Sequence, residues 1–288
     1  MKKIGVETIP KKVKELYCDE IHEFIIASGG LTSAHGTKEN YWVANLPILG
    51  YIDLSTGKQS AEKGVMKFVL TDKEHESGAF FKYFTNGCVY KIKGMLPKDT
   101  GDSKTDNIRR MNGLYITEIV EENAQNEFVQ SLVDEYNRIV SITSEVFGEM
   151  ILNKDLGWYE GSGIWMGEKV DVTISAEDAD SDISADLEAA EQFFADQQEW
   201  DRKIRGFAAE ELTDTANDWL ADSVDDEDEE PDEITTEDFA GRITIESICF
   251  DPEGEFTVYF GDDDMFWGHS VVVYGDIENG PNDAEMAG

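Results

Sequence analysis

The sequence predicts an α+β protein with two domains: an N-terminal small OB-like β-barrel, and a C-terminal antiparallel sheet covered by helices. Short β-branched and aromatic segments alternate with Gly, Asn and Asp clusters from about residue 22 to residue 120, a pattern typical of strands and turns. Apolar residues recur at helical spacing over 184–222, between two groups of strand-like segments. A chain of 288 residues is long enough for two modest cores.

The predicted N-terminal domain covers residues 1–150. Five or six strands within about 100 residues are typical of a closed or nearly closed barrel. The segment 126–140 has apolar residues at helical spacing, so an amphipathic helix ends the domain. Strand lysines are more often solvated or protect a sheet edge than bind nucleic acid, but a basic and aromatic face is an alternative. The predicted strands are 22–28, 41–54, 64–72, 80–84, 88–96 and 113–122, and the face would contain Lys82, Lys91, Lys93, Arg109, Arg110, Tyr83 and Tyr90.

The predicted C-terminal domain covers residues 151–288 in the order β-β-α-α-β-β-β. A hairpin with Gly167 in its turn precedes the helical region, for which Ser184 is the expected N-cap and Gly206 the expected break. A Thr-x-x-Asp capping box at 235–238 starts a short helix. The acidic run 222–234 is expected to be a solvated loop or linker. The last predicted strands, a three-stranded antiparallel meander, are 242–250, 255–260 and 266–276.

Negative charge is concentrated in the second half of the chain. Residues 1–153 contain 18 Lys and Arg against 22 Asp and Glu, a net charge of −4, whereas residues 154–288 contain 6 against 40, a net charge of −34; the whole chain has −38. Such a field repels nucleic-acid phosphates and anionic membranes, and it attracts basic proteins or cations. Three distant cysteines, no secretory leader pattern and no run of about 20 apolar residues predict a soluble, cytoplasmic protein.

The stretch FGDDDMFWGHSVVVYG at 260–275 has the most concentrated chemistry in the sequence. Gly268-His269-Ser270 resembles part of the G-x-S-x-G turn of serine hydrolases, but that turn needs glycine where Val272 stands, and no histidine follows the serine. A hydrolase site is therefore excluded. A P-loop, a GxGxxG fingerprint and a Cys/His catalytic pair are also absent from the sequence. The sequence favours a protein that is not an enzyme.

A metal site in the same stretch is the second interpretation. Asp262, Asp264 and His269 could provide oxygen and imidazole ligands for a divalent cation. The EF-hand and HExxH patterns are absent, and consecutive aspartates on a hairpin loop favour turns through local hydrogen bonds. We therefore expect a structural turn and no cofactor, with a divalent cation as the alternative.

Three segments resemble a bacterial family known as domain of unknown function 2262. They are GWYEGSGIWMGEKVDVTI, the helix QQEWDRKIRGFAAEELTDTANDWL and the closing FTVYFGDDDMFWGHSVVVYGDIENGPNDAEMAG, and the resemblance covers about 156–288. Residues 1–150 resemble a separate uncharacterised domain that often precedes this family. The resemblance implies a bacterial cytoplasmic protein and transfers no catalytic residue. By analogy, small acidic α+β families of this kind include immunity proteins. The acidic insertion 222–234 departs from the family pattern.

The first functional hypothesis is a non-enzymatic, immunity-protein-like module that captures a basic protein partner through its acidic domain. The second is a cation-binding protein or metal-dependent enzyme that uses Asp262, Asp264 and His269. A third is a barrel that binds an oligonucleotide or another protein domain. The oligomeric state is not predicted. The candidate contact residues of the first hypothesis are Asp262, Asp263, Asp264, Phe266, Trp267 and His269.

Overall fold

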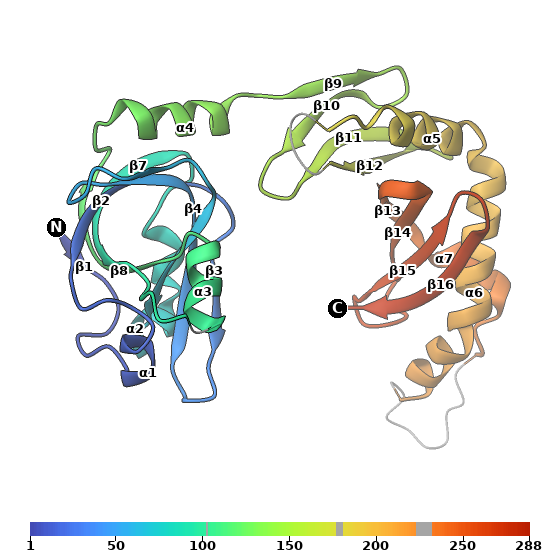
Figure 1. Cartoon of the computed structure of the whole chain (residues 1–288). Helices are drawn as coiled ribbons and strands as arrows, with labels where there is room; N and C mark the ends of the chain where they lie inside the picture. Colours follow the sequence, from blue (N-terminus) through green and yellow to red (C-terminus); the bar gives the residue numbers. More distant parts are fainter. Residues whose placement is uncertain (102, 177–180, 223–231) are drawn as a thin grey trace. The chain divides into compact units, whose positions relative to one another are not determined.

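The computed structural model describes residues 1–101, 103–176, 181–222 and 232–288. It divides into two compact units, Met1–Arg138 and Ile139–Gly288, which are described separately (Figure 1). The sequence placed the change of domain near residue 150; in the structure, the segment that follows Arg138 already pairs with the second unit. Most of the predicted acidic loop, 223–231, lies outside the described residues.

The N-terminal unit contains a closed five-stranded barrel, as the sequence predicted. Its strands are ordered β8-β6-β4-β2-β7, and pairing of β7 with β8 closes the ring. Strands β6 and β8 are parallel, whereas the other barrel neighbours are antiparallel. Numbered along the chain, the barrel strands follow the order 1-2-3-5-4 of an OB-like Greek key. The strands of this unit are β1 (Lys2–Lys3), β2 (His22–Ser28), β3 (Ser33–Gly36), β4 (Trp42–Asp53), β5 (Gln59–Ser60), β6 (Gly64–Val69), β7 (Cys88–Met95) and β8 (Leu114–Glu122).

Alternation of side chains explains how the barrel fills its interior. Phe24 and Ile26 on β2, and Met66 and Phe68 on β6, are fully buried inside it, and the members of each pair stand two residues apart along their strand. A Cβ atom on Gly94 would lie 2.7 Å from the carbonyl oxygen of Tyr115, so the close approach of β7 and β8 at this register shift requires glycine. The ring can close because this position has no side chain.

Short helices complete the N-terminal unit. They are α1 (Lys11–Lys14), α2 (Asp72–Ser77), η1 (Ala79–Lys82), α3 (Ser103–Arg110) and α4 (Glu127–Asn137). The expected strand at 80–84 is wrong, because a capping box at Thr71 starts α2 and left-handed Gly78 leads directly into η1. The predicted terminal helix is confirmed as α4, which begins at the N-cap Asn126 and buries Val129 and Val133 against the outside of the barrel.

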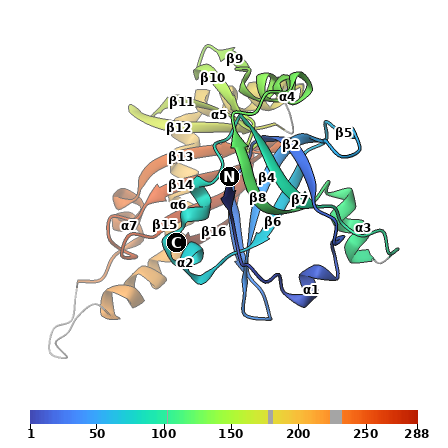
Figure 2. The ribbon, with the colours of Figure 1, turned by 90° about the vertical axis from the view of Figure 1, so that its left-hand side faces the viewer.

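The C-terminal unit is one eight-stranded sheet in sequential order from β9 to β16 (Figures 1 and 2). Among the described strands, β12 and β13 pair in parallel and the other neighbours are antiparallel. The described part of the connection between these two strands is helical, as expected for a crossover between parallel strands. The elements are β9 (Ser141–Ser144), β10 (Gly148–Asn153), β11 (Trp158–Trp165), β12 (Glu168–Ser175), α5 (Ser184–Ala195), α6 (Gln197–Asp222), α7 (Thr236–Arg242), β13 (Thr244–Phe250), β14 (Glu255–Gly261), β15 (Ser270–Asp276) and β16 (Gly280–Ala287).

The predicted antiparallel sheet covered by helices is therefore confirmed, with more strands than expected. Strands β9, β10 and β16 extend both edges of the predicted sheet. β16 has the sequence GPNDAEMA, which is poor in β-branched residues. It becomes a strand because its backbone pairs with β15 along most of its length. β-Propensity describes the preference of each residue and takes no account of a partner strand.

Helices α5 and α6 cover one face of this sheet, where Phe193 and Trp200 stack on each other and pack against Phe256. The helical region breaks at Asp196 and continues through Gly206, so the predicted break is wrong. The expected N-cap Ser184 is also wrong: it is the first helical residue, and its N–H and hydroxyl donate to Asp182. None of the described helices has the length and apolar character required to cross a membrane.

The capping box at 235–238 is confirmed. The hydroxyl of Thr235 accepts the N–H of Asp238 at 3.1 Å, and the Asp238 carboxylate accepts the N–H of Thr235 at 3.2 Å. Both donors would otherwise be unsatisfied at the start of α7. The cap sets where α7 begins, and α7 leads directly into β13.

Candidate interaction surface

The loop 262–269, which joins β14 to β15, is organised around one buried carboxylate. Asp262 is 6% exposed. Its Oδ2 accepts the N–H of Phe266 at 2.7 Å and the N–H of Gly268 at 3.1 Å, and its Oδ1 accepts the N–H of Asp264 at 3.3 Å. One side chain therefore satisfies three backbone donors of a tight loop, which is the local hydrogen bonding that aspartate provides in turns.

This loop has an unusual backbone. Asp263, Asp264, Trp267 and Gly268 all have positive φ, at 49°, 64°, 56° and 88°. A left-handed conformation costs a bulky L-residue about 1–2 kcal/mol, so the hydrogen bonds to Asp262 must offset the strain at Trp267. The strain has a geometric consequence: Phe266 points into the core while the next side chain points outward.

An aromatic cluster supports the outward tryptophan. Phe266 is fully buried, whereas Trp267 is 61% exposed. Trp219, from the last turns of α6, makes edge-on contacts with Phe266, Trp267 and His269 at centroid distances of 5.8, 4.8 and 5.4 Å. Nδ1 of His269 lies 2.5 Å from the carbonyl oxygen of Phe266, so this nitrogen carries the proton and donates it to the carbonyl.

The aspartates of the loop have three different roles. Asp262 is internal. Asp263 is exposed but pairs with Arg242 of α7 at 2.7 Å, and the arginine also donates to the Asp263 carbonyl. Asp264 is exposed, with its side chain in solvent. Of the six candidate residues, Asp264 and Trp267 present open surface, Asp263 and His269 are partly engaged, and Asp262 and Phe266 hold the loop in place.

The geometry of the loop also bears on the metal-site and serine-hydrolase interpretations. No group of three or more His, Cys, Asp or Glu side chains among the described residues is arranged to hold a metal ion. Both oxygens of Asp262 accept backbone N–H groups, so a metal ion bound there would compete with the hydrogen bonds that hold the loop. Ser270 begins β15, which continues as a strand to Asp276, and the sharp strand-to-helix turn of a hydrolase is not formed there.

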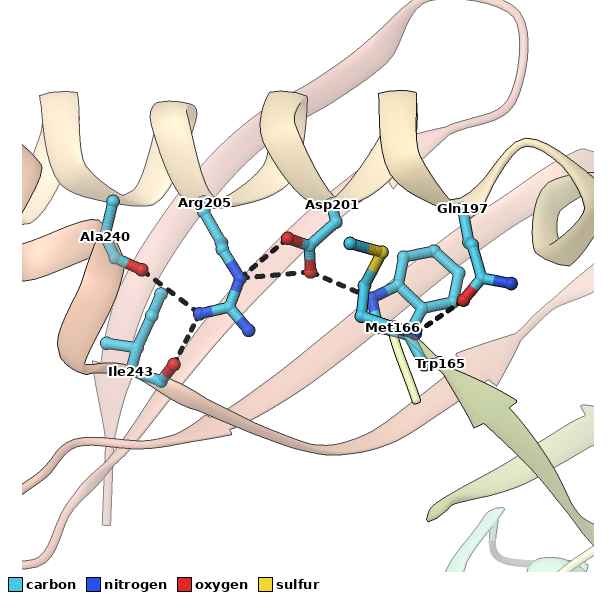
Figure 3. Close-up of polar contacts among 7 residues, drawn as sticks. All are labelled: Trp165, Met166, Gln197, Asp201, Arg205, Ala240 and Ile243. Atoms are coloured by element: carbon cyan, nitrogen blue, oxygen red, sulfur yellow. Dashed lines mark hydrogen bonds and ion pairs between the residues drawn. The ribbon is translucent and has the colours of Figure 1, made fainter. Parts of the chain in front are cut away.

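A polar network positions the two helices that support the loop (Figure 3). Asp201 of α6 accepts the indole N–H of Trp165 at 2.9 Å and both of its oxygens accept the Nε–H of Arg205 at 3.0 Å. Arg205 also donates to the carbonyls of Ala240 and Ile243 at the end of α7. An arginine is well suited to the unpaired carbonyls of a helix C-terminus. α6, which supplies Trp219, and α7, which supplies Arg242, are thus fixed to the same sheet.

Sequence reasoning missed two contributors to this surface. Trp219 fitted the apolar stripe of the long helix and was expected in the core, but it is half-buried at the helix end beside the loop. Arg242 was the first residue of the predicted strand 242–250, with no partner indicated, whereas in the structure it is the last residue of α7. A tryptophan near the end of an amphipathic helix, followed by acidic residues, is the signal that could have indicated the first.

The basic and aromatic face considered for the barrel is largely neutralised. Lys91 pairs with Glu23 at 2.8 Å, and Lys93 pairs with Glu118 at 3.1 Å. Arg109 pairs with Asp99 at 2.5 Å. The side chain of Arg110 lies outside the described structure. Strand cations that face carboxylates on the neighbouring strand stabilise the sheet and leave little positive charge for phosphates.

Each of the two units matches a known domain family. Residues 144–286 match a family described as an uncharacterized protein conserved in bacteria (DUF2262), and residues 10–136 match a separate domain of unknown function (DUF7021). The chain joins a DUF7021 domain to a DUF2262 domain. The resemblance drawn from the FWGHS region is thereby confirmed. No curated protein matches the chain. The DUF2262 domain contains the whole loop 262–269 and its supporting helices, and the DUF7021 domain contains the barrel.

Proposed function

We propose that the DUF2262 domain is a non-enzymatic recognition module that binds a basic protein partner through Trp267 and the exposed acids around it. The observation that carries the proposal is the preorganised tryptophan. Trp267 is 61% exposed, yet its backbone is held in a left-handed conformation by the Asp262 hydrogen bonds and its ring rests on Trp219. Tryptophan is enriched among residues that dominate binding energy, and a rigid side chain loses little entropy on binding.

Charge supports a basic partner. Residues 154–288 contain 6 Lys and Arg against 40 Asp and Glu. At the surface formed by the loop, Asp264 is exposed, and the end of α6 beside Trp219 adds exposed Asp214, Asp218 and Asp222. Acidic groups around an aromatic anchor accelerate encounter with a cationic surface and disfavour anionic partners.

Site-specific photo-crosslinking in the source bacterium tests the proposal. A benzophenone amino acid replaces Trp267 in one variant and Ile164 in a control variant; Ile164 is 58% exposed on β11 of the same domain. We expect a basic protein to be captured from position 267 and not from position 164. Capture from both positions alike, or of acidic proteins only, would contradict the proposal.

Binding of the captured protein is then measured with purified components. Trp267→Ala should weaken the complex about 30-fold, the effect of losing a hot-spot residue, whereas Ile164→Ala should leave the affinity unchanged. The affinity should also fall as NaCl rises from about 50 to 300 mM, because screening shortens the range of the acidic field. An affinity that is insensitive to both Trp267 and salt would refute the proposal.

A further inference from the structure

A small cavity lies on the outer wall of the DUF7021 barrel, beneath the N-terminal segment. Its volume is about 160 Å³. It is lined by strands β4, β6 and β8 on one side and by the segment that contains α1 on the other. The lining residues are Val13, Leu16, Tyr17, His35, Tyr41, Val43, Lys67, Val69, Ile108 and Tyr115.

The covering segment is held in place by backbone pairing. Tyr17 forms a bridge with Pro97, the N–H of Cys18 donates to Leu96, and the N–H of Lys98 donates to Leu16, the last two at 2.9 Å. Val13 is buried on the same side. In OB-like barrels this face of the second and third strands is the usual place for a ligand. Here the segment covers it, so the remaining space suits a small molecule better than a polymer.

One cationic side chain lies in this cavity without a counter-charge. Lys67 is half-buried on β6, between Met66 and Phe68, which point into the barrel core, so its side chain points to the opposite face. No ion pair or hydrogen bond joins Lys67 to another residue in the part of the chain that the structure describes. Burial lowers the pKa of its ammonium, as expected for a cation that has lost water and gained no partner. Such a group costs free energy unless something else pairs with it.

Two tyrosines line the same cavity as this cation. Tyr115 is paired with Lys67 in the β6–β8 register, and its oxygen accepts the N–H of Val69 at 3.3 Å, which leaves its hydroxyl proton for another acceptor. The ring of Tyr17 lies 5.4 Å from that of Tyr115. Tyr17 is 3% exposed, and among the described residues its hydroxyl has no hydrogen-bond partner. Burial raises the pKa of both phenols, so both remain donors at neutral pH.

We infer that this cavity binds a small organic carboxylate, with the carboxylate on Lys67 and the hydroxyls of Tyr17 and Tyr115, and a short apolar body against Val43 and Ile108. A single ammonium matches the single negative charge of a carboxylate. A phosphate would bring further negative charge into a half-buried space whose lining has no second lysine or arginine. The inference concerns the DUF7021 domain and is independent of the function proposed for the DUF2262 domain.

Calorimetric titration of the full chain with acetate, isobutyrate, benzoate, benzamide and inorganic phosphate tests this inference. We expect a saturable carboxylate site, with benzoate bound at least about tenfold more tightly than the uncharged benzamide. Lys67→Met should reduce benzoate affinity at least about tenfold, and Tyr17→Phe, which keeps the ring, should reduce it several-fold. Lys82→Met is the matched control, because Lys82 is exposed on η1 and does not line the cavity.

A stability readout separates binding from folding. Without ligand, Lys67→Met should unfold at the same or a higher temperature than the wild type, because an unpaired half-buried charge is removed. Benzoate should raise the melting temperature of the wild type and not of this variant. The inference is overturned if none of the three carboxylates saturates, if benzamide or phosphate binds as tightly as benzoate, or if Lys67→Met and Tyr17→Phe both keep wild-type affinity.

Discussion

Replacing Asp262 by alanine should unravel the loop that presents Trp267. The carboxylate accepts three backbone N–H groups, at 2.7, 3.1 and 3.3 Å. Hydrogen bonds to a charged acceptor contribute about 1.5–3 kcal/mol each, and a buried donor left unsatisfied costs a similar amount. The two shorter bonds dominate, so their loss amounts to at least about 3 kcal/mol. Relief of left-handed strain at Trp267 returns about 1 kcal/mol, which leaves a destabilisation of at least about 2 kcal/mol.

Asparagine at the same position provides an internal comparison. The two shorter bonds end on the same oxygen, Oδ2. The Asp262→Asn variant can keep its single oxygen there and place its amide nitrogen near the N–H of Asp264, where the native bond is longest. It should therefore lose about 1 kcal/mol, no more than about half of the loss in Asp262→Ala. Asp264→Asn, at an exposed left-handed position that asparagine tolerates, should stay within about 0.5 kcal/mol of the wild type.

Urea unfolding followed by tryptophan fluorescence is a suitable assay, because five of the six tryptophans lie in the unit Ile139–Gly288. In thermal unfolding, a loss of at least about 2 kcal/mol corresponds to a melting temperature lower by at least about 4 °C for a domain of this size. The reasoning is refuted if Asp262→Ala loses less than about 1 kcal/mol, or if asparagine and alanine cost the same.

Three further predictions follow from other contacts. Asp201→Ala should lower the free energy of unfolding of the DUF2262 domain by about 2–3 kcal/mol, because it leaves Arg205 mostly buried without its carboxylate; urea unfolding that matches the wild type would contradict this. Burial raises the pKa of the Asp53 carboxyl, but hydrogen bonds from His22 and the following turn outweigh it and hold that pKa below its ordinary value. The stability that this carboxylate contributes is thus present above its unfolded pKa and is lost as the pH falls through its folded pKa. Asp53→Asn should therefore flatten the decline in the melting temperature of the barrel below about pH 4. An unchanged slope would count against this prediction. Because residues 154–288 have a net charge of −34, raising NaCl from about 20 to 200 mM should raise the melting temperature of the DUF2262 domain by relieving self-repulsion, and a fall would contradict this.

Local patterns account for what the sequence predicted correctly. The capping box at 235–238, the hairpin around Gly167 and the helix from 127 to 137 depend on residues within a few positions of one another. The barrel strands have the β-branched and aromatic composition of half-buried surfaces. These features depend on residues a few positions apart in the chain, so a short stretch of the sequence is enough to predict them.

The errors have two different causes. β16 is a strand because its backbone pairs with β15, a partner that its own sequence does not indicate. The region 80–84 is not a strand because the capping box at Thr71 and the left-handed Gly78 start α2 and η1 there, local signals that the β-like composition of 80–84 concealed. The helical region breaks at Asp196 and not at Gly206, where a side chain would meet nothing within 4 Å and the helix continues without strain. Helix propensity is a weak guide when packing against a sheet determines the break.

For the candidate site, the sequence alone determined which residues are close together and what charge surrounds them. It predicted a hairpin loop between strands 255–260 and 266–276, excluded a hydrolase turn at Ser270 and showed the acidic imbalance of the second half. The predicted strand start at Phe266 is wrong, because hydrogen bonds to Asp262 keep residues up to Gly268 in the loop and β15 begins at Ser270. Only the tertiary structure separated Asp262, which holds the loop, from Trp267, which faces solvent, and brought Trp219 beside them. Only the tertiary structure placed Lys67, Tyr17 and Tyr115 on the lining of one cavity. Side-chain direction and burial depend on contacts between segments far apart in the chain, and neither composition nor spacing encodes them.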